Sequence, residues 1–329
     1  MPDLYYAATC QTDFPCPLDR SEIATRTKRM CAMAEQTIVG YEPFFDVRLL
    51  VFPEFAHAAP AYDNVAALRE KLAIPIPNEH TDAYEKLCRK YGCYIQTGSF
   101  LEADPAYPGK VFNTTVLIGP EGILSCYRKI NTWIPWEVHT SPHDIEDYTE
   151  EPFPVVDTEL GKLGVAICYD WLFPDTIRQI AFNGAEVINR VSAYMDPWGA
   201  TAPMDWWTLM NRARAVENTA YVVATNQGAA MEHYPPFSWP GGSMVVNYDG
   251  VILAQADPGP GEKVTVAPID ISALRAERKR RQGHDMRAHF RSEIHDYAGR
   301  SYLPRGDEET LSIENNNQRI RVAKDKTES

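Results

Sequence analysis

Short apolar runs alternate along the chain with stretches in which apolar residues recur at helical spacing. Continuous apolar runs of this length predict buried β-strands. The predicted strands span residues 5–10, 48–52, 94–99, 111–118, 163–167, 187–189, 221–225, 243–247, 251–254 and 264–269.

Helical spacing occurs between several of these strands. From Ile23 to Ala34 the apolar positions follow at i, i+4, i+7, i+8 and i+11, which form one face of a helix. A similar face runs from Ala83 to Tyr91, and another helix is predicted to begin near Pro203. Strands that alternate with helices in this way predict a layered α/β protein.

One predicted strand, 163–167, is followed directly by Cys168, and a helix is expected to begin at Pro174. Because proline suits the first turn of a helix, the thiol is predicted to lie at a strand-to-helix elbow. A sulfur placed there projects from the carboxyl end of a strand, and backbone N–H groups can meet the oxyanion that it creates. Taken alone, Cys168 is more typical of an inert core thiol.

Two other apolar runs also end on charged residues. Glu54 follows the strand at 48–52, and Lys129 closes the run that starts at Thr115. Each of the two alone is typical of a solvated surface charge. A Glu, a Lys and a Cys that each follow a strand of one sheet are expected to converge on a single crevice, since open α/β sheets place their chemistry there.

The three segments resemble the motifs of the nitrilase superfamily of carbon–nitrogen hydrolases, which have a Glu-Lys-Cys triad. The motifs here are Phe52-Pro53-Glu54, Tyr127-Arg128-Lys129, and Cys168-Tyr169-Asp170 with Phe173-Pro174-Asp175. Asp175 stands where the family usually has Glu. The resemblance extends over about residues 4–270 in order and spacing. It implies a four-layer α-β-β-α sandwich.

Further residues resemble the aliphatic amidase and formamidase branch of this superfamily. Glu137 stands eight residues after Lys129 in a YRKxxxWxPxE pattern, and Tyr194 lies in a Tyr-Met-x-Pro segment. In nitrilases proper the nucleophilic Cys is followed by Trp-Glu, whereas Tyr-Asp follows it here. The resemblance therefore favours a small primary amide, cleaved to the carboxylic acid and ammonia. An N-carbamoyl amine or amino acid is the alternative substrate, and a nitrile is less favoured.

The resemblance implies a role for each polar residue. Cys168 is expected to attack the carbonyl and Glu54 to carry protons. Lys129 and the backbone N–H of Tyr169 are expected to stabilise the oxyanion, so that a thioester forms and is then hydrolysed. Glu137 is expected to position the amide or the attacking water.

The polar residues and their surroundings lead to two more expectations. Two carboxylates close to Lys129 repel each other, so the pKa of one of them should be raised. Aromatic residues are expected in the pocket wall, although such residues more often only pack. The candidates are Tyr62, Trp133, Trp136, Tyr169, Tyr194 and Trp198.

Composition indicates which classes of partner and which cellular compartment to expect. The formal net charge of −13 argues against nucleic acid and anionic membranes. No apolar run is long enough for a membrane helix, and no signal peptide is expected. Seven scattered cysteines indicate reduced thiols and a cytoplasmic protein. Without a CxxC or HExxH spacing, neither a metal ion nor another cofactor is predicted. A non-catalytic binding protein is the alternative of a different class, and the three intact polar groups argue against it.

The chain is predicted to consist of a carbon–nitrogen hydrolase domain, residues 1–285, and a C-terminal tail, residues 286–329. Between residues 286 and 304 the tail has several large apolar side chains, and we expect them to dock on another subunit of a homo-oligomer. Residues 308–329 are polar and Asn-rich, which predicts disorder. Residues 131–152 lack periodicity and are expected to form a functional loop.

Overall fold

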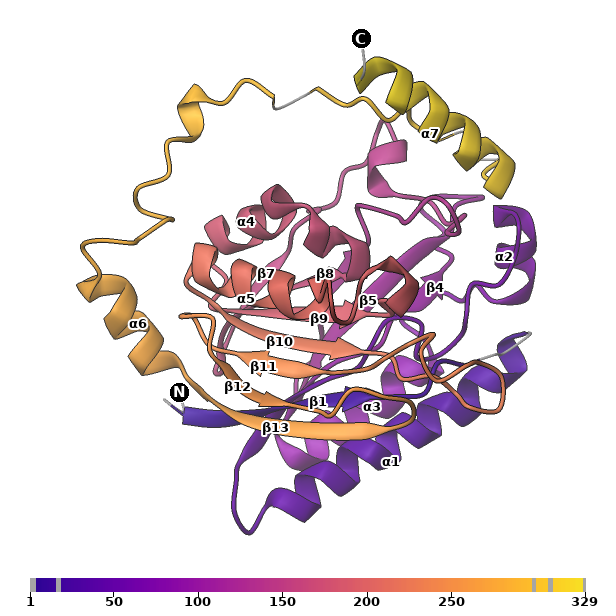
Figure 1. Cartoon of the computed structure of the whole chain (residues 1–329). Coiled ribbons are helices and arrows are strands. Elements are labelled where there is room, and N and C mark those ends of the chain that lie inside the picture. The colour runs from indigo at the N-terminus through magenta and orange to yellow at the C-terminus, as the bar shows by residue number, and fades with distance from the viewer. Residues whose placement is uncertain (1–3, 16–18, 298–299, 307–309, 328–329) are drawn as a thin grey trace.

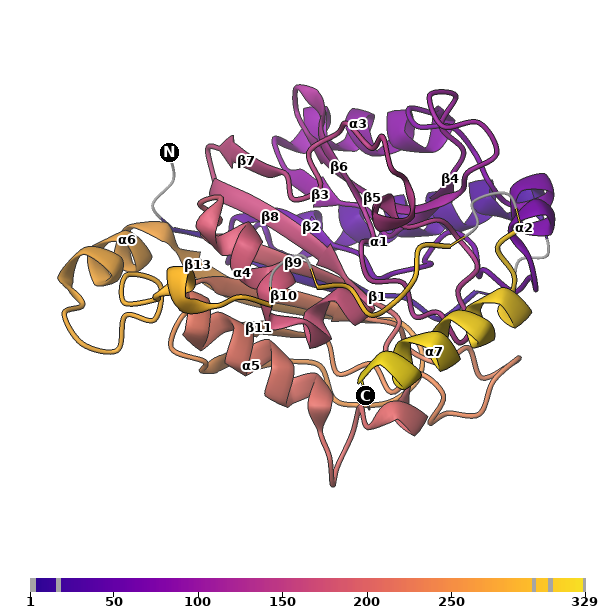
Figure 2. The same ribbon diagram turned by 90° about the horizontal axis from the view of Figure 1, so that it is seen from above.

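The computed structural model describes residues 4–15, 19–297, 300–306 and 310–327. Two β-sheets lie face to face, and helices cover the outer face of each, as the view along the layers shows (Figure 1, Figure 2). This arrangement is the α/β four-layer sandwich that the sequence predicted.

The first sheet has seven strands in the order β13-β1-β2-β3-β5-β4, with β6 paired to β5. β1, β2 and β3 are parallel, whereas β13 and β5 join them in antiparallel pairs. The strands are β1 (Leu4–Gln11), β2 (Val47–Val51), β3 (Tyr94–Gln96), β4 (Phe100–Glu102), β5 (Phe112–Gly119), β6 (Gly122–Arg128) and β13 (Lys263–Asp270). Helices α1 (Ile23–Tyr41) and α3 (Glu79–Tyr91) pack on the outer face of this sheet.

The second sheet has six strands in the order β12-β11-β10-β9-β8-β7. Its three central strands, β8 to β10, are parallel. The strands are β7 (Val155–Thr158), β8 (Gly161–Ile167), β9 (Val187–Ser192), β10 (Tyr221–Asn226), β11 (Met244–Val246) and β12 (Ile252–Gln255). Helices α4 (Pro174–Phe182) and α5 (Trp206–Asn218) cover its outer face.

The strands near the middle of each sheet are buried on both faces. In β2, Leu49 and Val51 pack into the core between the sheets, whereas Leu50 packs into the core beneath α1 and α3. Successive side chains of a strand point to opposite faces, so burial on both faces requires a continuous apolar run. For this reason the sequence predicted each of the central strands. It did not predict β4 and β7, because both are short and lie at sheet edges. It also did not separate β6 from β5, since it predicted one continuous run that starts at Thr115.

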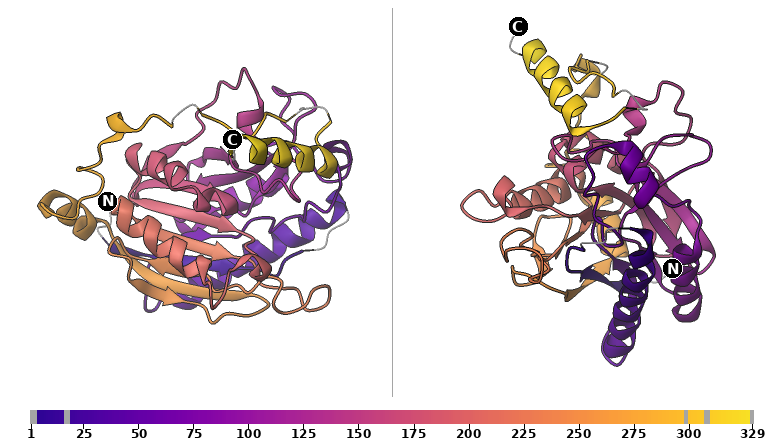
Figure 3. Two further views of the ribbon diagram at one scale, coloured as in Figure 1. Left: turned by 45° about the horizontal axis from the view of Figure 1, so that its top comes forward. Right: turned by 90° about the vertical axis from the view of Figure 1, so that its right-hand side faces the viewer.

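The C-terminal segment follows a course that the sequence did not predict. After α6 (Ile271–Arg280), residues 281–297 and 300–306 pass along the outside of the molecule towards α7 (Ile313–Thr327) (Figure 1, Figure 3). The backbone N–H of Ile313 donates to the carbonyl of Asp63 at 3.0 Å, just ahead of α2 (Val65–Lys71). The expected disorder of residues 308–329 is therefore wrong for residues 313–327. Buried polar contacts of α7, described below, replace the missing apolar pattern.

The tail also contains exposed apolar side chains. Ile294 is 72% exposed in the single chain, and Tyr297 and Tyr302 are exposed as well. In contrast, the ring of Phe290 packs against Phe182 of α4, with ring centroids 6.0 Å apart. The tail thus contacts its own chain at Phe290, and its docking on another subunit stays a prediction.

We expect a Gly98→Ala substitution to destabilise the protein by about 1–3 kcal/mol, because the site is already filled. A Cβ at Gly98 would lie 2.6 Å from the carbonyl oxygen of Pro53 and 2.5 Å from the Cβ of Ala56. Gly40→Ala is the control, since nothing lies within 4 Å of a Cβ at that position of α1. It should stabilise the protein by about 0.5–1 kcal/mol. Denaturant unfolding measures both changes, and equal stability of the two variants would contradict this account of the packing.

Candidate active site

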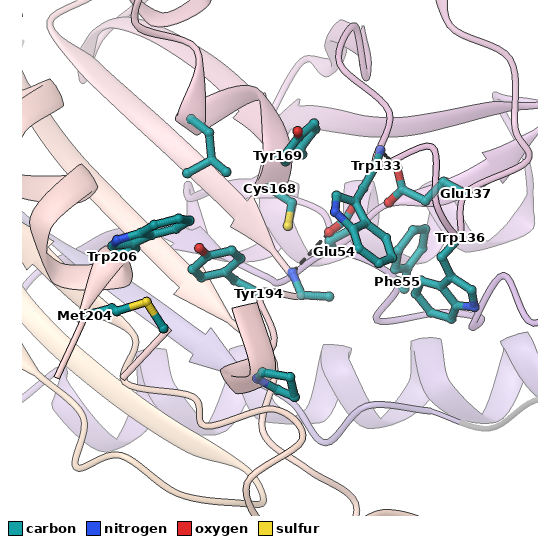
Figure 4. A pocket seen from close by; sticks show the side chains of 13 residues that line it. Glu54, Phe55, Trp133, Trp136, Glu137, Cys168, Tyr169, Tyr194, Met204 and Trp206 are labelled. Atoms are coloured by element: carbon teal, nitrogen blue, oxygen red, sulfur yellow. Dashed lines mark hydrogen bonds between the residues drawn. The ribbon is translucent and has the colours of Figure 1, made fainter. Parts of the chain in front are cut away.

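The three predicted chemical groups meet at the end of the sandwich, but they come from both sheets. Glu54 follows β2 and Lys129 follows β6 in the first sheet, whereas Cys168 follows β8 in the second. The expectation that all three follow strands of one sheet is therefore wrong. Because the two sheets stack face to face, the ends of β2, β6 and β8 still converge on one site (Figure 4).

Cys168 lies at the predicted elbow, directly after β8 and at the start of a 3-10 turn, Cys168–Leu172. Its φ of 46° falls in the left-handed region, which is uncommon for a residue other than glycine. Strained backbone of this kind persists where the surrounding structure fixes it, and it is concentrated at functional sites. The side chain is buried, with 7% of its surface exposed.

Asp170 fixes this elbow. Its buried carboxylate accepts hydrogen bonds from the backbone N–H of Ile167 at 3.0 Å and of Asn131 at 2.7 Å. The hydroxyl of Tyr127 donates to the same carboxylate at 2.7 Å. Asp170 therefore ties the turn that carries Cys168 to the segment next to Lys129. The sequence contained Asp170 within a motif but indicated no role for it.

The ammonium of Lys129 lies between two carboxylates. Its Nζ donates to Glu54 Oε1 at 2.8 Å, to Glu137 Oε1 at 2.6 Å and to Glu137 Oε2 at 2.9 Å. All three side chains are almost completely buried. Buried charges are stable only when they are paired and hydrogen-bonded, and here one cation joins two anions.

Further donors fix the carboxylates. The side-chain amide of Asn113 donates to Glu54 Oε1 at 2.8 Å, and the backbone N–H of Ala193 donates to Glu54 Oε2 at 3.1 Å. The backbone N–H of Trp133 donates to Glu137 Oε2 at 2.6 Å. The sequence contained no signal for Asn113, which stands apart from the motifs, and none for Ala193, which precedes Tyr194 but contributes only its backbone N–H.

Burial and the neighbouring charges separate the pKa values of the two carboxyl groups. Burial raises the pKa of Glu54 above its ordinary value; Lys129 opposes this rise, and the negative charge of Glu137 adds to it. Burial also disfavours ionised Glu137, but the charge of Lys129 and the proximity of His139 outweigh it and lower the pKa of Glu137 to about 2. One carboxyl pKa is thus raised, as the sequence predicted. Of the two carboxyl groups, Glu54 is the one that holds a proton more readily.

The other two groups are shifted toward their protonated forms. Burial alone would lower the pKa of Lys129, but Glu137 and Glu54 more than reverse this effect, so the ammonium stays charged. Burial raises the pKa of the Cys168 thiol to about 12, and the charge of Glu54 adds to the rise. Cys168 is therefore a neutral thiol at rest. It needs a base to become a nucleophile, and Glu54 lies beside its sulfur (Figure 4).

Cys168 and the two carboxylates open into a cavity of about 390 Å³. Its walls are mainly aromatic and aliphatic. The described lining residues are Glu54, Phe55, Trp133, Trp136, Glu137, Cys168, Tyr169, Leu172, Ala193, Tyr194, Pro197, Met204 and Trp206.

Four of the six residues predicted for the pocket wall line this cavity. Trp133, Trp136, Tyr169 and Tyr194 line it, as the sequence predicted. Tyr62 does not; it packs against an apolar cluster behind the wall. The side chain of Trp198 lies outside the part of the chain that the structure describes.

The sequence missed the wall that lies away from the carboxylates. This wall includes Met204 and Trp206, next to Tyr194 (Figure 4). Leu172 is a further lining residue that the sequence did not indicate. Met204 and Trp206 are 53% and 40% exposed, so they form the mouth of the cavity. Trp206 is the first residue of α5 and Met204 lies two residues before it, and no local pattern distinguishes a side chain that faces a cavity from one that faces solvent.

Comparison with known proteins agrees with this geometry. The profile of the carbon–nitrogen hydrolase family matches residues 6–279. A formamidase of Bacillus cereus (strain Q1) is 30% identical over 266 residues, which cover 79% of this chain and 73% of the relative. The chain therefore belongs to the carbon–nitrogen hydrolase family.

Solved structures show the same fold. Nit3 of Saccharomyces cerevisiae, from branch 10 of the nitrilase superfamily, superposes with a TM-score of 0.67 at 24% identity, over 85% of this chain and 96% of that one. An amidase from Nesterenkonia sp. superposes with a TM-score of 0.61 at 20% identity, over 88% of this chain and 95% of that one. The resemblance to the nitrilase superfamily and its amidase-like branch is confirmed, and the chain is an enzyme that hydrolyses carbon–nitrogen bonds of amides.

We expect Glu137→Gln to move the acid limb of the pH–rate profile to lower pH. Glu54 acts as a base only when ionised, so the rate falls as the pH drops through its raised pKa. Neutralising Glu137 removes its repulsion of ionised Glu54. It also leaves Glu54 as the only carboxylate bound to Lys129, and both effects lower the pKa of Glu54. The pH dependence of alkylation of Cys168 by iodoacetamide, followed by mass spectrometry, measures the limb. Glu54→Gln should abolish the limb, and an unmoved limb in Glu137→Gln would overturn the assignment of the base.

Proposed function

We propose that this enzyme is a thiol-dependent amidase that converts a small primary amide to its carboxylic acid and ammonia through a thioester on Cys168. One observation carries the proposal. The ammonium of Lys129 binds the carboxylates of Glu54 and Glu137, and this array lies beside a buried thiol. The array supplies a nucleophile, a proton carrier and a fixed positive charge, and amide hydrolysis needs all three.

In the first half of the reaction, the sulfur of Cys168 attacks the carbonyl carbon while Glu54 takes the thiol proton. The carbonyl oxygen becomes an oxyanion beside the Nζ of Lys129 and the backbone N–H of Tyr169. Glu54 then donates its proton to the amide nitrogen. The C–N bond breaks, ammonia leaves, and the acyl group remains on the sulfur.

In the second half, water attacks the thioester and Glu54 takes a proton from it. The C–S bond breaks, the proton passes from Glu54 to the sulfur, and the carboxylic acid leaves. Each half requires Glu54 to accept and return one proton, which suits a carboxyl with a raised pKa.

Glu137 is proposed to recognise the NH2 group of the substrate. Its low pKa keeps it ionised, and Lys129 and Trp133 fix its orientation. A carboxylate can only accept hydrogen bonds, so it distinguishes an amide, which has N–H donors, from a nitrile, which has none. A nitrile would forgo this hydrogen bond to Glu137, a loss that disfavours it relative to the amide.

The wall of the cavity also argues against an N-carbamoyl amino acid. None of the described lining residues is an arginine, lysine or histidine, and the two ionisable carboxyl groups of the wall are Glu54 and Glu137. The carboxylate of such a substrate would have no cationic partner among these lining residues. A neutral N-carbamoyl amine remains the alternative substrate.

We also propose that the enzyme acts in the cytoplasm as a homo-oligomer. The six cysteines that the structure describes are free thiols, which supports a reducing compartment. No helix in the described part of the chain has both the length and the apolar character to cross a membrane. The exposed side chains of Ile294, Tyr297 and Tyr302 support a contact with another subunit.

Cys168→Ala should abolish ammonia release and leave the protein folded, because the sulfur is the reagent and the lost volume is small. Cys168→Ser should be nearly inactive too, since a hydroxyl is a far weaker nucleophile. Fluoroacetamide, whose C–F carbon can alkylate the sulfur, should label Cys168 in the parent and not in either variant. Activity close to that of the parent in Cys168→Ala would rule out the proposed nucleophile.

We expect the enzyme to prefer primary amides whose acyl group is apolar and extends to Met204 and Trp206. The cavity is larger than a formyl or acetyl group requires, and each CH2 buried in it should raise kcat/KM by roughly fourfold, or about 0.8 kcal/mol. A series of unbranched amides and their matching nitriles measures this preference. Trp206→Ala should reduce kcat/KM for the longer amides and leave acetamide unaffected. A nitrile preference, or rates independent of chain length, would contradict the expectation.

A further inference from the structure

Helix α7 contacts the loop that carries Glu137, although the two are far apart in the chain. The side-chain amide of Asn316 donates to the backbone carbonyl of Glu137 at 2.9 Å, and only 1% of Asn316 is exposed. A hydrogen bond to a buried carbonyl is costly to lose, because no water replaces it. Asn316 therefore binds the backbone of the same residue, Glu137, whose carboxylate Lys129 binds.

A second contact joins α7 to the same loop. Arg319, one turn after Asn316, donates through Nη2 to Asp144 Oδ1 at 2.8 Å and through Nη1 to the side-chain oxygen of Asn316 at 3.1 Å. The carboxylate of Asp144 caps the short turn Pro142–Asp144 in the same loop, where the backbone N–H of Ser141 donates to it at 3.3 Å. Asn316 and Arg319 thus form a connected polar network that reaches the loop at Glu137 and at Asp144.

The position of this loop determines the geometry of the site. Lys129 follows a strand of the sheet, and its backbone N–H donates to the carbonyl of Asn113 at 2.9 Å. Glu137 instead lies in the irregular segment between β6 and β7, in a turn whose N–H bonds return to Trp133. A shift of this segment would move the Glu137 carboxylate away from the ammonium of Lys129 and from the substrate.

We infer that Asn316 is a positioning residue for Glu137, and that α7 clamps the substrate-binding loop of the amidase site. The inference rests on the proposed function for its catalytic consequence, whereas the clamp itself is a property of the folded chain. It assigns a role to a segment whose polar sequence predicted disorder. A change in α7 should therefore alter amide recognition without touching the substrate.

The test compares Asn316→Ala with Asn317→Ala. Both replace the same residue type at adjacent positions of α7, so their effects on helix propensity match, but Asn317 is exposed. Asn316→Ala should lower kcat/KM for a primary amide by about tenfold, the effect of losing one buried hydrogen bond. Asn317→Ala should leave it unchanged. The ester of the same acid, which has no NH2 for Glu137 to bind, should be affected less than the amide in Asn316→Ala.

A double-mutant cycle separates positioning from general destabilisation. If Asn316 acts through Glu137, adding Asn316→Ala to Glu137→Gln should cause little further loss of amide activity. If the two losses multiply, the inference is wrong. Arg319→Met, with the exposed Arg321→Met as its control, provides a second pair of variants should Asn316→Ala fail to fold.

Hydrogen exchange tests the clamp without any substrate. The backbone amides of residues 130–145 should exchange about tenfold faster in Asn316→Ala than in Asn317→Ala, because the loop opens more often. Equal exchange in the two variants would overturn the clamp. If the parent hydrolyses no amide and fluoroacetamide does not label Cys168, the proposed function fails, and the exchange result still decides whether α7 holds the loop.

Discussion

The site depends on the interaction of the Lys129 ammonium with two buried carboxylates. Glu54 and Glu137 both accept hydrogen bonds from this one ammonium. Two carboxylates so close together in a buried site would not both stay ionised without a cation between them. Lys129 allows Glu137 to remain an anion while Glu54 keeps a raised pKa. One lysine thus gives two chemically equivalent side chains different protonation behaviour, which suits the tasks proposed for them, proton exchange for Glu54 and substrate recognition for Glu137.

The sandwich explains how these groups are brought together and kept dry. The sheets contribute their strand ends from opposite sides, so Cys168 and Glu54 are held by two different frameworks. Asp170 links the two frameworks, because it lies in the turn after β8 and accepts hydrogen bonds from Ile167 at the end of β8 and from Asn131 after β6. The left-handed backbone of Cys168 is stabilised by this link.

How much the sequence predicted depended on whether the information was local. Strands buried on both faces and polar residues at their ends leave a pattern within a few positions, so the layers and Glu54, Lys129 and Cys168 could be predicted. The sheet to which each strand belongs is a long-range property, and its prediction was wrong. The mouth residues Met204 and Trp206 and the buried contacts of α7 were missed for the same reason, since an isolated Asn or Arg looks alike whether it is buried or solvated.

The composition of the cavity wall has a consequence for the end of the proposed reaction. The substrate is neutral, but the acid that forms from it ionises to an anion near neutral pH. That anion forms beside Glu54 and Glu137, in a cavity otherwise lined mainly by apolar and aromatic side chains. Like charges at short range in such surroundings repel strongly. Lys129 neutralises only one of the two carboxylates, so the array keeps a net negative charge and the proposed reaction should end with its product anion repelled from the site.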